Sequence, residues 1–109
     1  MALAQVQEVD AEPYIKLPAH ADASLTDLSK AGSDVFLLVC KRLLADRVLG
    51  QHGRVGLNVR IAGEQPRPVS ESVYRRGLKE LLEKGWLTKS SLADVFLINR
   101  QFFDVGYGD

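Results

Sequence analysis

The residues with the clearest binding chemistry lie between positions 70 and 84. Hydroxyl and cationic side chains recur there at spacings of three and four, at Ser72, Arg75, Arg76 and Lys79. Residues spaced in this way share one face of a helix. Arginine, lysine and serine side chains bind phosphate oxygens, and an arginine can also pair with both major-groove acceptors of guanine. The pattern therefore predicts a helix face that binds a polyanion, although a solvated surface helix with (i, i+4) ion pairs would show the same residues.

Other reactive side chains are sparse, which argues against an enzyme. His20 and Asp22 could be half of a metal site, but the only other histidine is His52, so we expect no metal. Cys40 lies within an apolar run and is expected to be a core residue rather than a catalytic thiol. Because the sequence also has no glycine-rich phosphate loop, we expect no catalytic residue, no cofactor and no small-molecule substrate.

Length and composition indicate one ordinary globular domain. The chain has 109 residues, 46 % of them hydrophobic and 26 % charged. Its single cysteine cannot form an internal disulfide, and its longest apolar run has only six residues, from 35 to 40. The N-terminus has neither a basic start nor an apolar stretch typical of a secretory signal. These features predict a cytoplasmic protein without a membrane partner.

The net charge is zero, but the charges are unevenly distributed. Residues 1–50 hold five basic and seven acidic side chains, a balance of −2, whereas residues 51–89 hold eight and four, a balance of +4. A nucleic-acid-binding protein needs positive charge only where it meets phosphate. The distribution permits such a face, and the net charge of zero predicts that any binding is moderate for each subunit and strengthened by formation of a homodimer.

Hydrophobic periodicity predicts the elements of the first two thirds of the chain. A main helix should begin at Ser29 or Ser33 and run to about Asp46, with an apolar stripe at spacings of three and four. Residues 54–61 alternate between apolar and polar side chains, which predicts a half-buried strand. The two prolines within residues 62–68 make a long helix there implausible.

The last third has clear start and stop signals. Ser70 should cap a helix over residues 71–84, and Gly85 should end it in a left-handed conformation. Residues 86–89 and 94–99 should then form a hairpin around residues 90–93. We expect a flexible segment at 1–13, a short strand or extended arm at 14–17, and a tail at 100–109 that packs back on a domain spanning 14–109.

The order helix, strand, loop, helix and hairpin predicts an α+β fold of the winged-helix type, in which the second helix enters the major groove of double-stranded DNA beside the hairpin. Residues of that helix and of the hairpin are the candidate DNA contacts: Ser70, Ser72, Arg75, Arg76, Lys79, Lys89, Ser90 and Ser91. The alternative is a protein–protein interaction module without DNA binding. Its docking surface would be aromatic, formed by Phe102, Phe103, Tyr107 and Trp86.

Residues 70–87 and 95–103 also resemble the RepL-type plasmid replication proteins, which end in a recognition helix, a short wing and a Tyr-x-Ile-Asn-Pro-x-x-Phe motif. Ile98, Asn99 and Phe102 match that motif, with Arg100 in place of its proline, and the resemblance covers roughly residues 14–104. The family has a full helix before the recognition helix; here the glycine and prolines of residues 63–68 replace it with a loop or shrink it to one turn. The resemblance implies a homodimeric DNA-binding protein of a plasmid or phage-type element, acting in replication initiation or its transcriptional control.

Overall fold

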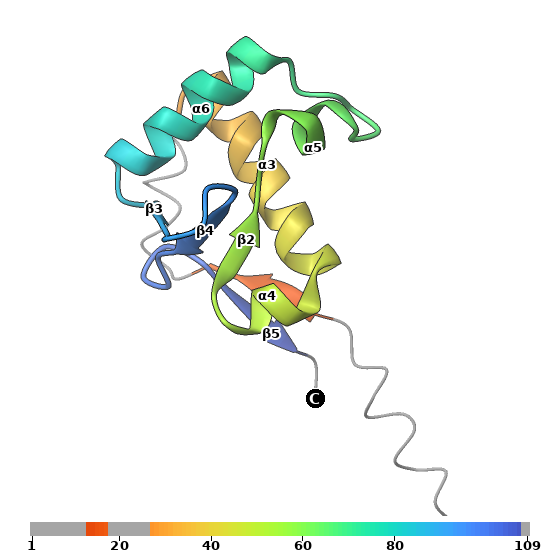
Figure 1. Ribbon diagram of the computed structural model, residues 1–109. Coiled ribbons are helices and arrows are strands. Elements are labelled where there is room, and N and C mark those ends of the chain that lie inside the picture. Colours follow the sequence, from red (N-terminus) through yellow and green to blue (C-terminus); the bar gives the residue numbers. More distant parts are fainter. Residues whose placement is uncertain (1–12, 18–26, 108–109) are drawn as a thin grey trace, which may run out of the picture.

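The computed structural model describes residues 13–17 and 27–107. Within these residues the chain is an α+β structure of four helices and two small antiparallel sheets (Figure 1). The segment predicted to be flexible lies outside the described residues, except for Pro13, which begins the first strand. His20 and Asp22, the candidate half of a metal site, also lie outside them.

The main helix, α3 (Lys30–Ala45), begins where the sequence predicts it. Ser29 is its N-cap, and the Ser29 hydroxyl accepts a hydrogen bond from the Gly32 amide at 3.1 Å. The helix ends at Asp46, whose carboxylate caps the short helix α4 (Arg47–Gln51) by accepting from the Leu49 amide at 3.1 Å. The sequence predicts only the end of the main helix and a following loop for these residues, so α4 is an addition to the prediction.

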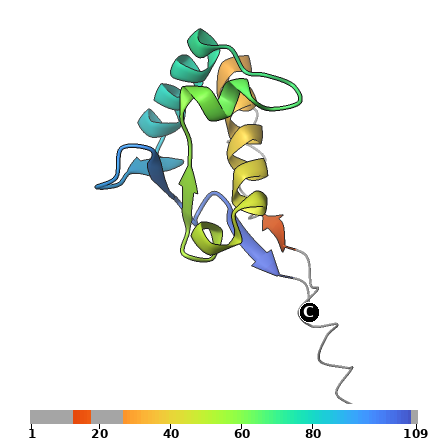
Figure 2. The same cartoon turned by 45° about the vertical axis from the view of Figure 1, so that its right-hand side comes forward.

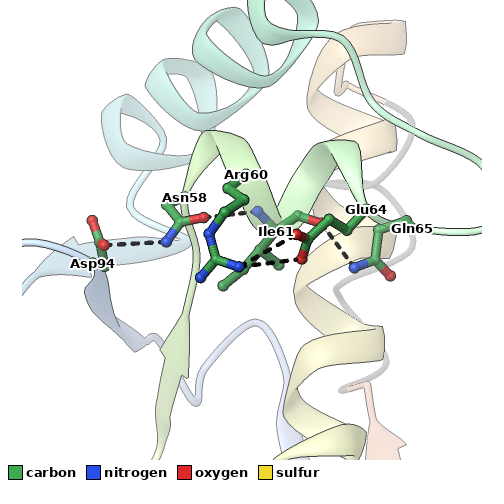
Figure 3. Close-up of polar contacts among 6 residues, drawn as sticks. All are labelled: Asn58, Arg60, Ile61, Glu64, Gln65 and Asp94. Atoms are coloured by element: carbon green, nitrogen blue, oxygen red, sulfur yellow. Dashed lines mark hydrogen bonds and ion pairs between the residues drawn. The ribbon is translucent and has the colours of Figure 1, made fainter.

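The predicted strand over residues 54–61 is wrong in its second half. Strand β2 (Arg54–Gly56) is short, and Asn58 starts helix α5 (Val59–Gly63) instead. The Asn58 side-chain oxygen accepts from the Ile61 amide at 2.7 Å, an N-cap bond that fixes the helical turn (Figure 3). Val59, Ile61 and Ala62 still contribute to the core, because a single helical turn can also bury such residues.

Helix α6 (Glu71–Glu83) agrees with the prediction at both ends. Ser70 is its N-cap, and Gly85 follows it with a φ of +81°. The helix crosses α3 closely, as Figure 1 shows. A Cβ atom on Gly77 would overlap the carbonyl group of Ala31, and one on Gly32 would lie 2.8 Å from the Glu80 carboxyl carbon. Glycine at position 77 therefore permits the close crossing, because the Ala31 backbone cannot move aside, whereas at Gly32 the neighbour is the end of a flexible side chain.

The hairpin after α6 is confirmed, and it pairs with the strand that precedes α5. Strands β3 (Leu87–Lys89) and β4 (Val95–Ile98) are antiparallel, with Thr88 opposite Leu97. Strand β2 pairs with the other edge of β4, so the sheet has the order β2-β4-β3. Figure 2 shows the hairpin projecting from the body of the molecule next to the C-terminal half of α6.

The tail packs back on the domain, as predicted. Strand β5 (Asp104–Tyr107) pairs with β1 (Pro13–Lys16) at the end of the molecule opposite α6 (Figure 1). Phe103 and Trp86 are each only 1 % exposed and lie against Phe36 in the core. The predicted aromatic docking surface is therefore wrong for these two residues. Phe102 is half-buried and stacks on Trp86 with a ring separation of 4.7 Å.

Candidate functional site

The outer face of α6 exposes the cationic residues that the sequence singles out. Arg75 forms an ion pair with Glu71 at 2.8 Å, but the two side chains remain 66 % and 59 % exposed. Such a surface pair contributes little, about 0.3–0.5 kcal/mol, so a phosphate can compete for the guanidinium. Arg76 and Lys79 are exposed, and within the described part of the chain neither forms an ion pair. The same face carries the exposed Ser72.

A groove between α6 and β3 brings the hairpin cation together with two of the helix cations. Its apolar part is formed by Tyr74, Leu78 and Leu82. The charged residues that line it are Arg75, Lys79, Lys89 and Glu83. Three cations therefore face one carboxylate along the groove. Arg76 lies about 100° around the helix axis from Arg75 and does not line this groove.

The serines named as candidate contacts occupy different environments. The Ser90 hydroxyl donates to the Val95 carbonyl at 2.6 Å and accepts from the Leu92 amide at 3.0 Å, so it holds the hairpin turn together. Ser91 is exposed beside it. Ser70 is also exposed, and its hydroxyl accepts from the Val73 amide at 3.4 Å as the cap of α6. Of the three, Ser91 has its hydroxyl least committed to local structure.

The start of the second hairpin strand is connected to α5. The Asn58 side-chain amide donates to the Asp94 carboxylate at 3.1 Å, so one residue both caps α5 and fixes the hairpin (Figure 3). The last turn of α5 is held by an exposed ion pair of Arg60 with Glu64 at 3.3 Å and by a hydrogen bond from Gln65 to the Ile61 carbonyl at 2.9 Å. These bonds stabilise a helix of only five residues in front of α6.

Two buried groups with reactive atoms are held in their neutral forms. Burial raises the pKa of the Cys40 thiol to about 12, in keeping with a residue packed against the core. Burial, together with the nearby Asp94 carboxylate, raises the pKa of Tyr74 to about 12, against the opposing charge of Arg75. Neither side chain is an activated nucleophile at neutral pH.

Further cations lie next to the loop that joins α5 to α6, and none of them is among the predicted DNA contacts. Arg67 is exposed between two prolines, three residues before the cap of α6. It lines a second groove, between this loop and α3, together with Lys30 and Lys41. Lys30 is partly neutralised by Asp34 at 3.3 Å. The sequence shows that these residues are basic, but only the tertiary structure brings them together beside α6.

A carboxylate on the inner side of α6 ties it to the start of α3. Glu80 accepts hydrogen bonds from the Ser29 amide at 3.0 Å and from the Ser29 hydroxyl at 2.5 Å. Lys84 pairs with Glu80 at 3.1 Å and donates to the Asp27 carbonyl at 2.7 Å. The two bonds from Ser29, followed by the charge of Lys84, lower the pKa of Glu80. This cluster fixes the angle at which α6 presents its outer face.

We expect Glu80→Gln to lower the free energy of unfolding by about 1–2 kcal/mol at pH 7, because a neutral amide accepts these bonds more weakly. A carboxylate with a lowered folded-state pKa stabilises the fold above its unfolded pKa of about 4.3 and loses that effect as the pH falls through the folded value. The difference from wild type should therefore shrink below about pH 4 in urea titrations. Glu83→Gln, at an exposed position, is the control and should change little; a pH-independent loss for Glu80→Gln would contradict the assignment.

Comparisons with models of known protein families, with curated proteins and with solved structures gave no significant match. Within residues 13–17 and 27–107, no helix is long and apolar enough to cross a bilayer. The same residues contain no group of three or more metal-ligating side chains. The exposed cations of α6, with Lys89 beside them, are therefore the candidate site that the geometry itself favours.

Proposed function

We propose that this chain is a winged-helix protein that binds double-stranded DNA, with α6 in the major groove and the β3–β4 hairpin as the wing. The element order α3, α4, β2, α5, α6, β3, β4 supports this proposal, as does the sheet order β2-β4-β3. In this arrangement the strand before α5 holds the hairpin from one edge, and the hairpin lies beside the helix that reads the groove.

The observation that carries the proposal is the set of cations available on one side of the molecule. Arg76 and Lys79 are exposed without an ion pair in the described structure, Arg75 has only a surface pair, and Lys89 lies across the groove from α6. Guanidinium and ammonium groups in this position can bind phosphates on both sides of a major groove, while an arginine reaches guanine.

The resemblance to RepL-type proteins supports a narrower proposal, that the chain acts as a homodimer in the replication, or its transcriptional control, of a plasmid or phage-type element. The short α5 fits one of the two expectations for the segment before α6, namely a helix shrunk to a single turn. Arg67 then lies in the loop between α5 and α6, where a side chain can reach a phosphate at the groove edge.

The test is the salt dependence of binding to a labelled duplex taken from the DNA next to the chain's own gene. We expect the variant Arg75→Ala/Arg76→Ala/Lys79→Ala to bind about 100-fold more weakly at low salt, since each lost base or phosphate contact costs about 1 kcal/mol or more. The slope of log affinity against log salt should fall by up to about 3, because each neutralised phosphate contributes about 0.9. Fluorescence anisotropy at several salt concentrations measures both quantities.

A charge-matched control separates this surface from general electrostatic attraction. Lys16, Arg47 and Arg54 are exposed on β1, α4 and β2, towards the end of the molecule opposite α6 (Figure 1). Replacing all three by alanine should leave the affinity within a few-fold of wild type. Equal losses in both triple variants, or wild-type affinity in the α6 variant, would contradict the proposed surface. A wild-type protein that binds a partner protein but shows no salt-dependent DNA binding would favour the interaction module instead.

A further inference from the structure

The turn of the β3–β4 hairpin holds an apolar side chain in a fixed, exposed position. Residues 90–94 read Ser-Ser-Leu-Ala-Asp, so the turn contains no cation. The Ser90 hydroxyl bonds to the Val95 carbonyl and to both the amide and the carbonyl of Leu92, at 2.6, 3.0 and 3.1 Å. These bonds fix the backbone of Leu92, yet its side chain is 64 % exposed. The turn therefore presents a leucine in a preformed geometry rather than on a loose loop.

The one charged side chain of the turn, Asp94, is exposed but is engaged by a hydrogen bond to α5. The Asp94 carboxylate accepts a hydrogen bond from the Asn58 side-chain amide at 3.1 Å, at the start of α5 (Figure 3). Lys89, at the other end of the turn, lines the groove beside Arg75 and Lys79. The apolar tip is thus continuous with the cationic surface through Lys89, and the Asp94 carboxylate has a hydrogen-bond partner in Asn58.

We propose that Leu92 is an apolar wedge that enters the minor groove next to the site of α6 and partly unstacks one base step. This inference rests on the proposed DNA-binding function. Proteins that insert leucine or similar side chains between base steps bend the duplex, and the bend brings more of the duplex into contact with the protein. Lys89 binds the phosphate at the groove edge and holds the tip in place. A tip of this kind favours steps that unstack easily, such as TA, over G·C-rich steps.

The experiment uses the full chain and a duplex from the DNA next to its gene, labelled at its two ends with a fluorescence donor and acceptor. Wild type should bring the ends together by bending the duplex, by roughly 20–90°. Leu92→Ser should abolish the bend and weaken binding about tenfold, the loss expected when a buried leucine contact is removed. The salt slope should stay unchanged because no cation is lost. Leu92→Met, which keeps an apolar side chain of similar size, should retain most of the bend.

Val48→Ser is the matched control, since Val48 is 70 % exposed on α4, away from the hairpin. It should bend DNA as wild type does. Wild-type bending by Leu92→Ser, or salt-dependent binding by wild type without any bend, overturns the wedge and leaves the proposed function standing. The absence of any binding by wild type overturns both. Sedimentation without DNA tests whether Leu92 instead contacts a second copy of the chain. A change of oligomeric state in Leu92→Ser would assign Leu92 to such a contact and would also overturn the wedge.

Discussion

Gly77→Val is expected to lower the free energy of unfolding by more than about 3 kcal/mol, or to prevent folding altogether. Gly77 lies where α6 crosses α3, and even a methyl group there would overlap the Ala31 carbonyl and the Val35 side chain. The obstructing atoms include backbone, so a change of rotamer cannot relieve the overlap and the helices must separate. Separation would also weaken the Glu80 bonds to Ser29, which join the same two helices.

Replacing glycine by alanine tests this explanation, because helix propensity and steric overlap predict stability changes of opposite sign at Gly77. Replacing glycine by alanine inside a helix usually stabilises it by about 1 kcal/mol. Gly77→Ala should nevertheless destabilise, whereas Gly63→Ala should be neutral or stabilising, because nothing lies within 4 Å of a Cβ at Gly63. Urea unfolding can be followed by the fluorescence of Trp86, the only tryptophan in the sequence. A Gly77→Ala protein as stable as wild type would show that the crossing is not tight.

Trp86→Ala should have an effect of similar size, a loss of about 3–5 kcal/mol. Trp86 is 1 % exposed and forms the centre of an aromatic cluster, edge-on to Phe36 at 5.2 Å and stacked on Phe102 at 4.7 Å. Its removal leaves a cavity bounded by rigid rings from α3 and from the segment before β5, which cannot collapse to fill it. Since a domain has only about 5–15 kcal/mol of stability in total, a large fraction would be lost.

Thermal unfolding followed by circular dichroism measures this loss, because the variant has no tryptophan to report it. Trp86→Phe should recover much of the stability, since a smaller ring still meets Phe36 and Phe102. Val48→Ala, at a 70 % exposed position, should remain within about 0.5 kcal/mol of wild type. If Trp86→Ala and Val48→Ala were equally stable, the aromatic cluster would not be a main support of the fold.

The sequence predicted best the elements whose ends carry local signals. Ser29 and Ser70 cap α3 and α6, and Gly85 adopts the left-handed conformation expected after a helix. These signals depend on bonds within a few residues, so one sequence suffices to find them. The hairpin is predicted for the same reason, since its two strands are separated by a short turn that begins with two serines.

The error at residues 57–61 has a physical cause. Val55, Leu57, Val59 and Ile61 alternate as a strand would, and all four contact the core. Two geometries can bury such a run, and the cap at Asn58 decides between them by bonding to the Ile61 amide. The sequence signal for a helix start was Asn58 itself, because asparagine is a favoured N-cap residue and lies three positions before Ile61. Alternation over so few residues is therefore weaker evidence for a strand than the capping residue is for a helix.

The candidate site was predictable only in part. Helical spacing placed Arg75, Arg76 and Lys79 on the outer face of α6, and the structure exposes all three. The juxtaposition of Lys89 with Arg75 and Lys79 arises from tertiary packing. So does the bond between Ser29 and Glu80, which are 51 positions apart in the chain. The local use of the Ser90 hydroxyl likewise depends on the turn geometry rather than on residue type.

The ladder between β1 and β5 sets the order in which the molecule can assemble during synthesis. Its register joins Pro13 to Tyr107 and Lys16 to Asp104, so β1 acquires its partner only after residues 104–107 have been synthesised. Contacts of such large separation form late because a long loop must close first. The helices and the hairpin can assemble before that, and closure of the ladder then joins the two strands of the described structure that lie farthest apart in the sequence.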